Sequence, residues 1–252
     1  YYYLDGCRLT GMQNIDDSLY YLDPARDGAM SCGWIFTENK WYYAGPSGAL
    51  ANGWQLIGGQ WYWFDSLDGC SMVTGRRVID GHPYLLGTYG LINGWCLDNG
   101  LWYWGSNGEV LTGWLQTGNN WYWLDPANDG AMSRGIVSVG SSRYYLSDSG
   151  AMAVGWAFDG TDWYYADGSG ALASGWRSVN GAWYWLDIAN DNRMVTGFFS
   201  IGSNRYHFSS TGALSLGWFM SDGDWYYAEP SNASGIVKTG WLKDGSQYYY
   251  LD

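Results

Sequence analysis

The chain has 252 residues and is rich in Trp, Tyr and Gly (19, 23 and 38 residues), while only 14% of its residues are charged. Its net charge of -12 argues against nucleic acid and anionic membranes as partners, because aromatic platforms for nucleic acid normally lie in a basic groove. No stretch of about 18 apolar residues is present, so membrane insertion is not expected.

Both ends of the chain carry the same short sequence, YYYLD, at residues 1–5 and 248–252. Residues 1–10 therefore form a partial repeat that lacks its first half. The start also lacks the basic and apolar regions of a signal peptide. We expect the chain to come from a longer secreted protein, in which any catalytic domain would lie outside this sequence.

A unit of about 20 residues fills the rest of the chain and opens each time at a glycine. The opening residues are Gly11, Gly33, Gly53, Gly75, Gly94, Gly113, Gly135, Gly155, Gly175, Gly197, Gly217 and Gly240. Single hairpins of this length are marginally stable alone, so neighbouring units must bury their apolar faces on one another. The sequence predicts an all-β solenoid of β-hairpin repeats, with residues 1–252 as a single elongated array.

Residues 113–125, GWLQTGNNWYWLD, show why each unit is expected to be a hairpin. Trp114 and Trp121 flank a polar spacer that contains Gly, as two short strands around a tight turn would. Trp121 and Trp123 alternate with Tyr122, so they leave one face of a strand while Tyr122 leaves the other. The central Tyr of such triplets is therefore expected to be a core residue.

The units of about 20 residues themselves recur in cycles of three. Two consecutive units carry both Trp residues, and the third carries neither. These Trp-less units open at Gly11, Gly75, Gly135 and Gly197. Every third hairpin is therefore expected to meet a different environment.

Four cysteines occur, without a CxxC pair or a Cys/His cluster, so no metal site is predicted. Cys7 with Cys32, and Cys70 with Cys96, could form disulfides between neighbouring hairpins. The alternative is four unpaired thiols that act as small apolar residues.

Catalytic residues are not predicted, and the chain is not expected to be an enzyme or to need a cofactor. Its two histidines, His82 and His207, both lie in Trp-less units. The carboxylates recur in turns, as Asp125 does, and repetition argues against a unique acid–base pair. Residues 232–234 match a glycosylation sequon, which we interpret as an ordinary turn.

The units GWAFDGTDWYYADGSGALAS and GWLQTGNNWYWLDPANDGAMSR resemble the cell-wall-binding repeats of choline-binding proteins of Gram-positive bacteria and their phages. This resemblance covers essentially all of the chain. It implies a left-handed β-solenoid with about three hairpins per turn, secreted and associated with the cell wall. It also implies ligand sites between successive hairpins, each with two aromatic rings from one unit and one from the next.

The resemblance assigns six such sites, each with a third ring that we expect in the outer position of the next triplet. They are Trp34, Trp41 and Trp63; Trp95, Trp102 and Trp123; Trp114, Trp121 and Tyr145; Trp156, Trp163 and Trp185; Trp176, Trp183 and His207; and Trp218, Trp225 and Tyr250. Trp54 and Trp61 would face Leu85, which leaves that site without a third ring.

Two classes of function remain open from the sequence. The first is a non-catalytic attachment module that binds choline, or choline-bearing wall teichoic or lipoteichoic acid. The second is a glucan-binding or other carbohydrate-binding array, or a structural spacer of a surface protein or toxin. A quaternary ammonium has no hydrogen-bond donor, so aromatic rings suit its recognition.

Overall fold

The computed structural model describes residues 1–231 and 234–252. Asn232 and Ala233 of the sequon lie outside the described residues. Within the described residues, no helix is long and apolar enough to span a bilayer.

The first strand of each hairpin begins at the glycine that opens a unit. These strands are β3 (Gly11–Ile15), β6 (Gly33–Thr37), β8 (Gly53–Ile57), β11 (Gly75–Ile79), β14 (Gly94–Asp98), β17 (Gly113–Thr117), β20 (Gly135–Val139), β22 (Gly155–Phe158), β24 (Gly175–Val179), β27 (Gly197–Ile201), β29 (Gly217–Ser221) and β31 (Gly240–Asp244).

The return strands carry the aromatic triplets or their replacements. They are β4 (Ser18–Asp23), β7 (Lys40–Ala44), β9 (Gln60–Asp65), β12 (His82–Gly87), β15 (Leu101–Ser106), β18 (Asn120–Asp125), β21 (Ser142–Leu146), β23 (Trp163–Ala166), β25 (Ala182–Asp187), β28 (Asn204–Phe208), β30 (Asp224–Ala228) and β32 (Gln247–Leu251). The partial repeat at the start forms β1 (Tyr3–Leu4) and β2 (Cys7–Arg8). The all-β hairpin architecture predicted from the sequence is confirmed.

Short strands and single turns of 3-10 helix connect the hairpins. The short strands are β5 (Ala29–Met30), β10 (Ser71–Met72), β13 (Gly90–Leu91), β16 (Glu109–Val110), β19 (Ala131–Met132) and β26 (Arg193–Met194). The helical turns are η1 (Pro24–Arg26), η2 (Ser66–Asp68), η3 (Pro126–Asn128) and η4 (Ile188–Asn190). An Asp caps each turn: the Asp65 carboxylate, for example, accepts from the Leu67 amide at 2.9 Å.

Turn chemistry explains why the hairpins are so tight. Glu38 and Asn39 both have positive φ, as do Gly58 and Gly59. Two consecutive residues with positive φ form the type I′ turn, whose twist matches that of the two flanking strands. The short polar spacer of each unit therefore fixes both the position and the register of its hairpin.

Strand register divides the side chains of each hairpin between two faces. In β6 and β7, Trp34 is opposite Tyr43 and Phe36 is opposite Trp41, so these four rings share one face, which we call the front face. Ile35 is opposite Tyr42 on the other side, which we call the back face. The front face faces the next hairpin along the chain.

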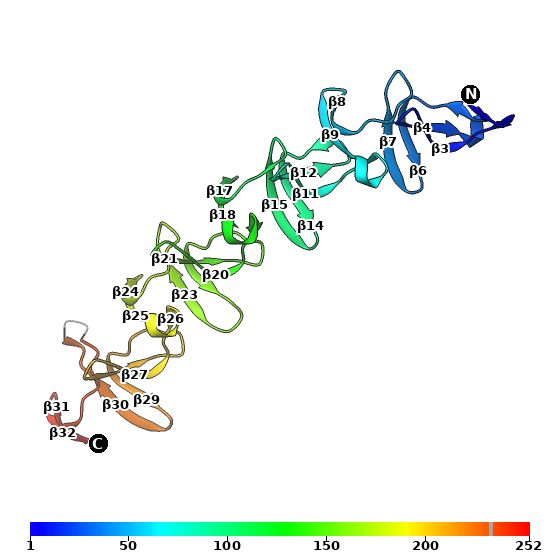
Figure 1. The fold of residues 1–252 in the computed structure, drawn as a ribbon. Coiled ribbons are helices and arrows are strands. Elements are labelled where there is room, and N and C mark those ends of the chain that lie inside the picture. The colour runs from blue at the N-terminus through cyan, green and yellow to red at the C-terminus, as the bar shows by residue number, and fades with distance from the viewer. Residues whose placement is uncertain (232–233) are drawn as a thin grey trace. The chain divides into compact units, whose positions relative to one another are not determined.

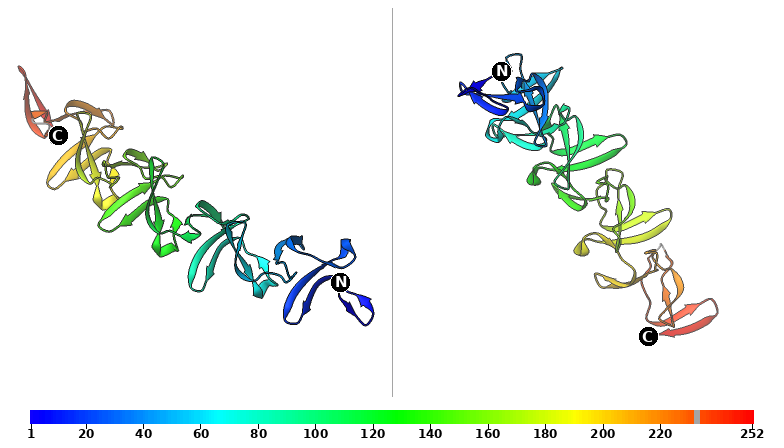
Figure 2. Two further views of the ribbon diagram at one scale, coloured as in Figure 1. Left: turned by 90° about the horizontal axis from the view of Figure 1, so that it is seen from above. Right: turned by 90° about the vertical axis from the view of Figure 1, so that its right-hand side faces the viewer.

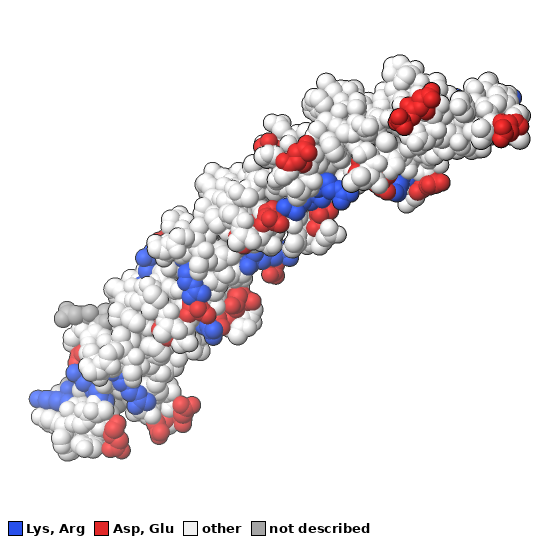
Figure 3. All heavy atoms as spheres, in the orientation of Figure 1, with Lys and Arg blue, Asp and Glu red and all other residues white. Residues whose placement is uncertain are grey.

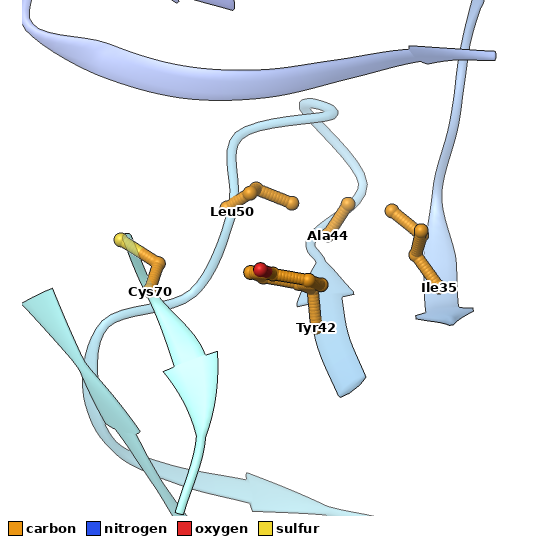
Figure 4. Close-up of a cluster of buried hydrophobic side chains, with 5 residues drawn as sticks. All are labelled: Ile35, Tyr42, Ala44, Leu50 and Cys70. Carbon is orange, nitrogen blue, oxygen red and sulfur yellow. The ribbon is translucent and has the colours of Figure 1, made fainter. Parts of the chain in front are cut away.

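The core forms where the front face of one hairpin meets the back face of the next. Ile35 and Tyr42, on the back of β6 and β7, are buried in a cluster with Leu50 and Cys70 (Figure 4). Met12, Leu19 and Tyr21, from the hairpin before, pack against this cluster. The central Tyr42 is thus a core residue, as the sequence predicts.

Backbone hydrogen bonds hold the stack as well. The Leu50 amide, which follows the second hairpin, donates to the Leu19 carbonyl of the first at 2.7 Å. The Leu172 amide donates to the Arg143 carbonyl at 2.8 Å. Leu19 and Arg143 occupy the position at which other units carry their second Trp. The contact uses only the backbone, so Trp-less units keep the same stacking.

The chain divides into two compact units. Unit 1 contains Tyr1–Leu115 and Trp123–Met132, and unit 2 contains Gln116–Tyr122 and Ser133–Asp252. Each is a succession of hairpins joined by short loops (Figures 1 and 2). In unit 1 two neighbouring hairpins share one sheet, with the strand order β11-β12-β16-β15-β14. The single array, its left-handedness and three hairpins per turn stay predictions.

The two disulfides considered from the sequence are not formed, and all four cysteines are free thiols. Cys70 is buried against Tyr42 and Leu50, whereas Cys96 is buried in a different cluster with Leu85 and Tyr103. Two sulfurs that point into separate cores cannot meet without moving the backbone. Cys7 and Cys32 are exposed and also unpaired.

Candidate ligand site at the hairpin junctions

A cavity of about 330 Å³ opens between the second and third complete hairpins, in unit 1. The front face of β6 and β7 provides Trp34 and Trp41, whose ring centroids are 6.2 Å apart at an interplanar angle of 87°. The back face of β9 provides Tyr62, whose ring lies 4.9 Å from that of Trp34. Met72, in β10, also lines the cavity.

Each wall of this cavity is held by its neighbours. Phe64 is fully buried behind Trp34, with ring centroids 6.0 Å apart, and Phe36 lies 4.9 Å from Trp41. Trp34 and Trp41 nevertheless remain about two-fifths exposed, at 40% and 39%. The two indoles are therefore fixed on one side and open to a ligand on the other.

The same three-ring geometry recurs in unit 2. Trp156 lies 6.4 Å from Trp163 and 4.7 Å from Tyr184 of the next hairpin. Trp176 lies 6.3 Å from Trp183 and 5.2 Å from Tyr206. The repeated spacing follows from the repeated register, since each first Trp faces the central residue of the next return strand.

The third rings expected from the sequence lie one residue away from the rings that face these Trp pairs. The six residues expected there contact rings of their own hairpin or of the following one. Within their own hairpins, Trp63 contacts Trp54, Trp123 contacts Trp114, Trp185 contacts Trp176, and Tyr250 contacts Trp241. Strand alternation explains this packing, because the residues on either side of the central Tyr leave the front face.

Tyr145 and His207 likewise turn toward the next junction. The Tyr145 ring stacks on that of Tyr164 at 6.0 Å, and its hydroxyl donates to the Phe158 carbonyl. The His207 ring stacks on Phe219 at 4.3 Å and lies within hydrogen-bond distance of the Ser215 hydroxyl, at 2.8 Å. Burial lowers the pKa of His207 below its ordinary value, so a neutral packing residue fits this position.

One junction left incomplete by the sequence analysis has all three rings. Trp54 lies 6.4 Å from Trp61 and 4.9 Å from Tyr84 of the next hairpin. Leu85, the residue expected there, is fully buried in another cluster. Strand alternation from Tyr62 to Tyr84 was the signal that could have found this site.

The remaining Trp residues occupy equivalent strands. Trp95 and Trp102 lie 6.4 Å apart. Trp121 is about two-fifths exposed, and its carbonyl accepts from the Met152 amide. Trp218 lies 4.8 Å from Tyr249, which again is the central residue of the next triplet.

A polar cavity near the end of unit 2 brings together two residues expected in the last site. Trp225 and Tyr250 line this space of about 360 Å³ with Arg205 and Lys238. Its lining is mixed and charged, in contrast to that of the Trp34 cavity. The first Trp of this unit, Trp218, donates from its indole nitrogen to the Asp244 carboxylate at 2.8 Å.

At junctions that follow Trp-less units, other side chains stand in the positions of the Trp pair. Arg76 replaces the first Trp, and its guanidinium lies 5.7 Å from the centre of the Tyr103 ring and 3.4 Å from the Asp129 carboxylate. Arg205 replaces a second Trp and lies 3.9 Å over the Phe198 ring. In each case a cation of the chain already covers an aromatic face.

Aliphatic side chains fill the other two junctions of this kind. Met12 and Leu19 pack on the cluster that contains Tyr42, as described above. Ile136 packs on a cluster that contains Tyr164, which is only 2% exposed. Arg143 replaces the second Trp of the unit that contains Ile136, and its guanidinium pairs with the Asp191 carboxylate at 2.9 Å.

The chemistry of the three-ring sites is that of an apolar cation receptor. The rings offer their negative faces, and the thioether of Met72 adds a polarizable contact. Large parts of the visible surface carry neither acidic nor basic side chains (Figure 3). Within the described residues, no group of three or more His, Cys, Asp or Glu could hold a metal ion. A ligand that needs dispersion and ring electrostatics, and no hydrogen bond, fits such a site.

Comparison with known proteins places the chain in a family. The family model of cell wall binding repeats of the choline-binding type matches more than half of its residues, in segments 33–50, 52–66, 112–132, 154–172, 174–187, 196–214, 217–231 and 239–252. The chain therefore belongs to the family of cell wall binding repeats. No curated protein sequence matches it.

Solved structures of choline-binding proteins share this fold. CbpJ from Streptococcus pneumoniae is 28% identical, with a TM-score of 0.58, and the match covers 93% of this chain and 96% of that one. Choline binding protein F from the same organism is 25% identical, with a TM-score of 0.56 and coverage of 93% and 95%. A structure of the latter in the presence of a peptidoglycan analogue is 28% identical, with a TM-score of 0.50 and coverage of 97% and 92%.

Proposed function

We propose that this chain is a secreted, non-catalytic attachment module that binds choline groups of wall teichoic or lipoteichoic acid. The observation that carries the proposal is the Trp34 cavity, with two indoles from one hairpin and a phenol ring from the next. Membership of the family of cell wall binding repeats supports cell-wall association.

Choline fits these sites for a specific physical reason. Its trimethylammonium group has no N–H to donate, so water holds it less firmly than a primary ammonium. Aromatic faces attract the charge and make dispersion contacts with the methyl groups. Three such faces line the cavity, from Trp34, Trp41 and Tyr62.

One such site is weak, and the array compensates by repetition. Three rings that contribute roughly 0.5 to 2 kcal/mol each yield a total of about 1.5 to 6 kcal/mol. A binding free energy of about 4 kcal/mol corresponds to a millimolar dissociation constant. Several sites on one chain, facing a polymer with many choline groups, raise the overall affinity through effective concentration.

Ligand binding is proposed at the junctions with a Trp pair and not after the Trp-less units. In those junctions other side chains, among them Arg76 and Arg205, stand in the positions of the Trp pair, so the two indole walls of a site are missing. Choline-soaked crystals with density next to Tyr103 or Tyr164 would contradict this assignment.

Intrinsic Trp fluorescence of the full chain tests the function directly. We expect the fluorescence to change saturably with millimolar choline and to change much less with ethanolamine. Ethanolamine has the same carbon chain as choline, but its primary ammonium is strongly hydrated. Dextran tests the carbohydrate alternative. A response to dextran with none to choline up to about 100 mM, well above the millimolar range, would overturn the proposal in favour of glucan binding.

A further inference from the structure

The turn at residues 87–90 differs from the equivalent turns of the chain. Gly87 pairs with Gly90, and Leu86 pairs with Leu91, so Thr88 and Tyr89 form a two-residue turn. In unit 2, the equivalent strand pairs one residue further on, with Phe208 opposite Leu214. The turn in unit 1 is therefore shorter, and it carries an aromatic residue at its tip.

This turn lies close against the strand that provides the third ring of the Trp34 cavity. A Cβ atom on Gly90 would lie only 2.8 Å from the Trp61 carbonyl oxygen in β9. Gly90 also has a φ of 96°, which residues with a side chain rarely adopt. The absence of a side chain at this position lets the turn reach β9, and it thereby holds Tyr89 at the cavity.

Thr88 and Tyr89 both line the cavity together with Trp34, Trp41 and Tyr62. Tyr89 is 86% exposed, so its ring is available to a ligand and contributes little to the core. The turn at residues 209–212 in unit 2 reads Ser, Ser, Thr, Gly and has no ring to offer. Of these two turns, only the one in unit 1 adds a fourth aromatic side chain to the three rings of its junction.

The cavity is larger than a trimethylammonium group requires. Its volume of about 330 Å³ corresponds to roughly ten water molecules at about 30 Å³ each. Space therefore remains beside the inner three rings for the substituent that the quaternary nitrogen carries. That part of the ligand would meet Thr88 and Tyr89, which line the same cavity.

We infer that Tyr89 is a specificity-determining residue, which gives the Trp34 site a fourth aromatic wall and a preference for quaternary ammonium ligands with an extended substituent. This inference rests on the proposed binding of quaternary ammonium groups. An exposed ring contact with a cation typically changes affinity by about two- to five-fold. The Trp34 site should therefore saturate at a lower ligand concentration than the matched Trp156 site.

The Trp156 junction is a suitable internal control because its inner rings have nearly the same geometry. The first Trp lies 4.9 Å from the facing Tyr in one site and 4.7 Å in the other, both at 68°. The two Trp–Trp distances are 6.2 and 6.4 Å. A difference in affinity between the two sites then reports mainly on the turn.

The test uses the full chain labelled with 5-fluorotryptophan and followed by fluorine NMR. The resonances of Trp41 and Trp163 are assigned with Trp41→Phe and Trp163→Phe and then titrated with choline and with benzyltrimethylammonium. We expect Trp41 to titrate at a two- to five-fold lower ligand concentration than Trp163, with the larger ratio for benzyltrimethylammonium. Tyr89→Ala should remove the difference, and Tyr89→Phe should keep it.

Two results would overturn the inference, and they can be told apart. If Trp41 and Trp163 titrate together and Tyr89→Ala changes neither, Tyr89 has no role while the proposed function stands. If no fluorotryptophan resonance responds to either ligand, the proposed function fails, and the inference fails with it. Circular dichroism of Tyr89→Ala checks that the variant folds, which its exposure leads us to expect.

Discussion

The ring of Trp34 lies edge-on to the ring of Tyr62, with 4.9 Å between centroids and an angle of 68°. The two residues belong to successive hairpins, so this contact both stacks the hairpins and forms the inner corner of the ligand cavity. Edge-to-face pairs of this kind contribute about 0.5–1.5 kcal/mol beyond their buried area. Packing and the proposed binding are therefore properties of the same junction.

Replacement of Trp41 by Ala should weaken ligand binding at one site with little effect on folding. Its ring is 39% exposed and forms an outer wall of the cavity. Loss of one ring, at roughly 0.5 to 2 kcal/mol, corresponds to an affinity loss of about two- to thirty-fold. This loss of affinity is measured by fluorine NMR of the chain labelled with 5-fluorotryptophan, from the Trp34 resonance during a choline titration. Leu67→Ala, at a residue that is 96% exposed, is the matched control and should change nothing.

Replacement of Phe64 by Ala should destabilise unit 1 by roughly 3–5 kcal/mol, because it leaves a cavity in the core. Phe64 is fully buried and supports the Trp34 ring from behind. Urea unfolding followed by circular dichroism measures the loss. The Trp34 site should also bind choline more weakly, and a variant as stable as the parent would show that this residue does not support the junction.

Two glycines with similar positive φ should differ in their tolerance of Ala. Gly28 and Gly33 have φ values of 75° and 83°. A Cβ atom on Gly28 would lie 2.6 Å from the Leu9 carbonyl oxygen, whereas one on Gly33 would have open space. Gly33→Ala should cost about 1–2 kcal/mol for the left-handed conformation alone. Gly28→Ala should lower the urea midpoint further, and equal midpoints would contradict the predicted clash.

Tyr164 should ionise after the ordinary tyrosines. Burial, together with the hydrogen bond that its hydroxyl donates to Asp159 at 3.0 Å, raises its pKa to about 12. Because the folded pKa lies above the unfolded value of about 10, the stabilisation is complete below pH 10 and is lost as the pH rises toward 12. Ultraviolet titration measures the ionisation. Asp159→Asn should lower this pKa, and an unchanged value would leave burial as its sole cause.

The cysteines should react in two classes. Cys7 and Cys32 are exposed, whereas burial raises the pKa of Cys70 and of Cys96 and shields both thiols. The thiolate is the reactive form, so a disulfide reagent at pH 8 should modify two thiols rapidly and two slowly. Denaturant should expose all four. Fewer than four thiols in unreduced, denatured protein would reveal a disulfide that the structure lacks.

The Trp pairs of the sites could be read from the sequence, because each pair lies within a single hairpin. Trp156 and Trp163 flank one turn, and their contact at 6.4 Å needs only that local register. The third ring stays a prediction: the sequence analysis places it at Trp185, whereas the ring that contacts Trp156 across the junction is that of Tyr184. Alternation along the strand explains the difference, since only the central residue leaves the back face.

By itself, the sequence determined where the hairpins begin, how tightly they turn and that every third one lacks its Trp pair. These features depend on turn residues with positive φ and on a side-chain period of two, both of which are local. Tertiary structure alone decided which rings meet across a junction, that Cys70 and Cys96 point into separate cores, and that Tyr89 reaches the Trp34 cavity. Such contacts join residues from different hairpins, and their distances depend on how one hairpin packs on the next.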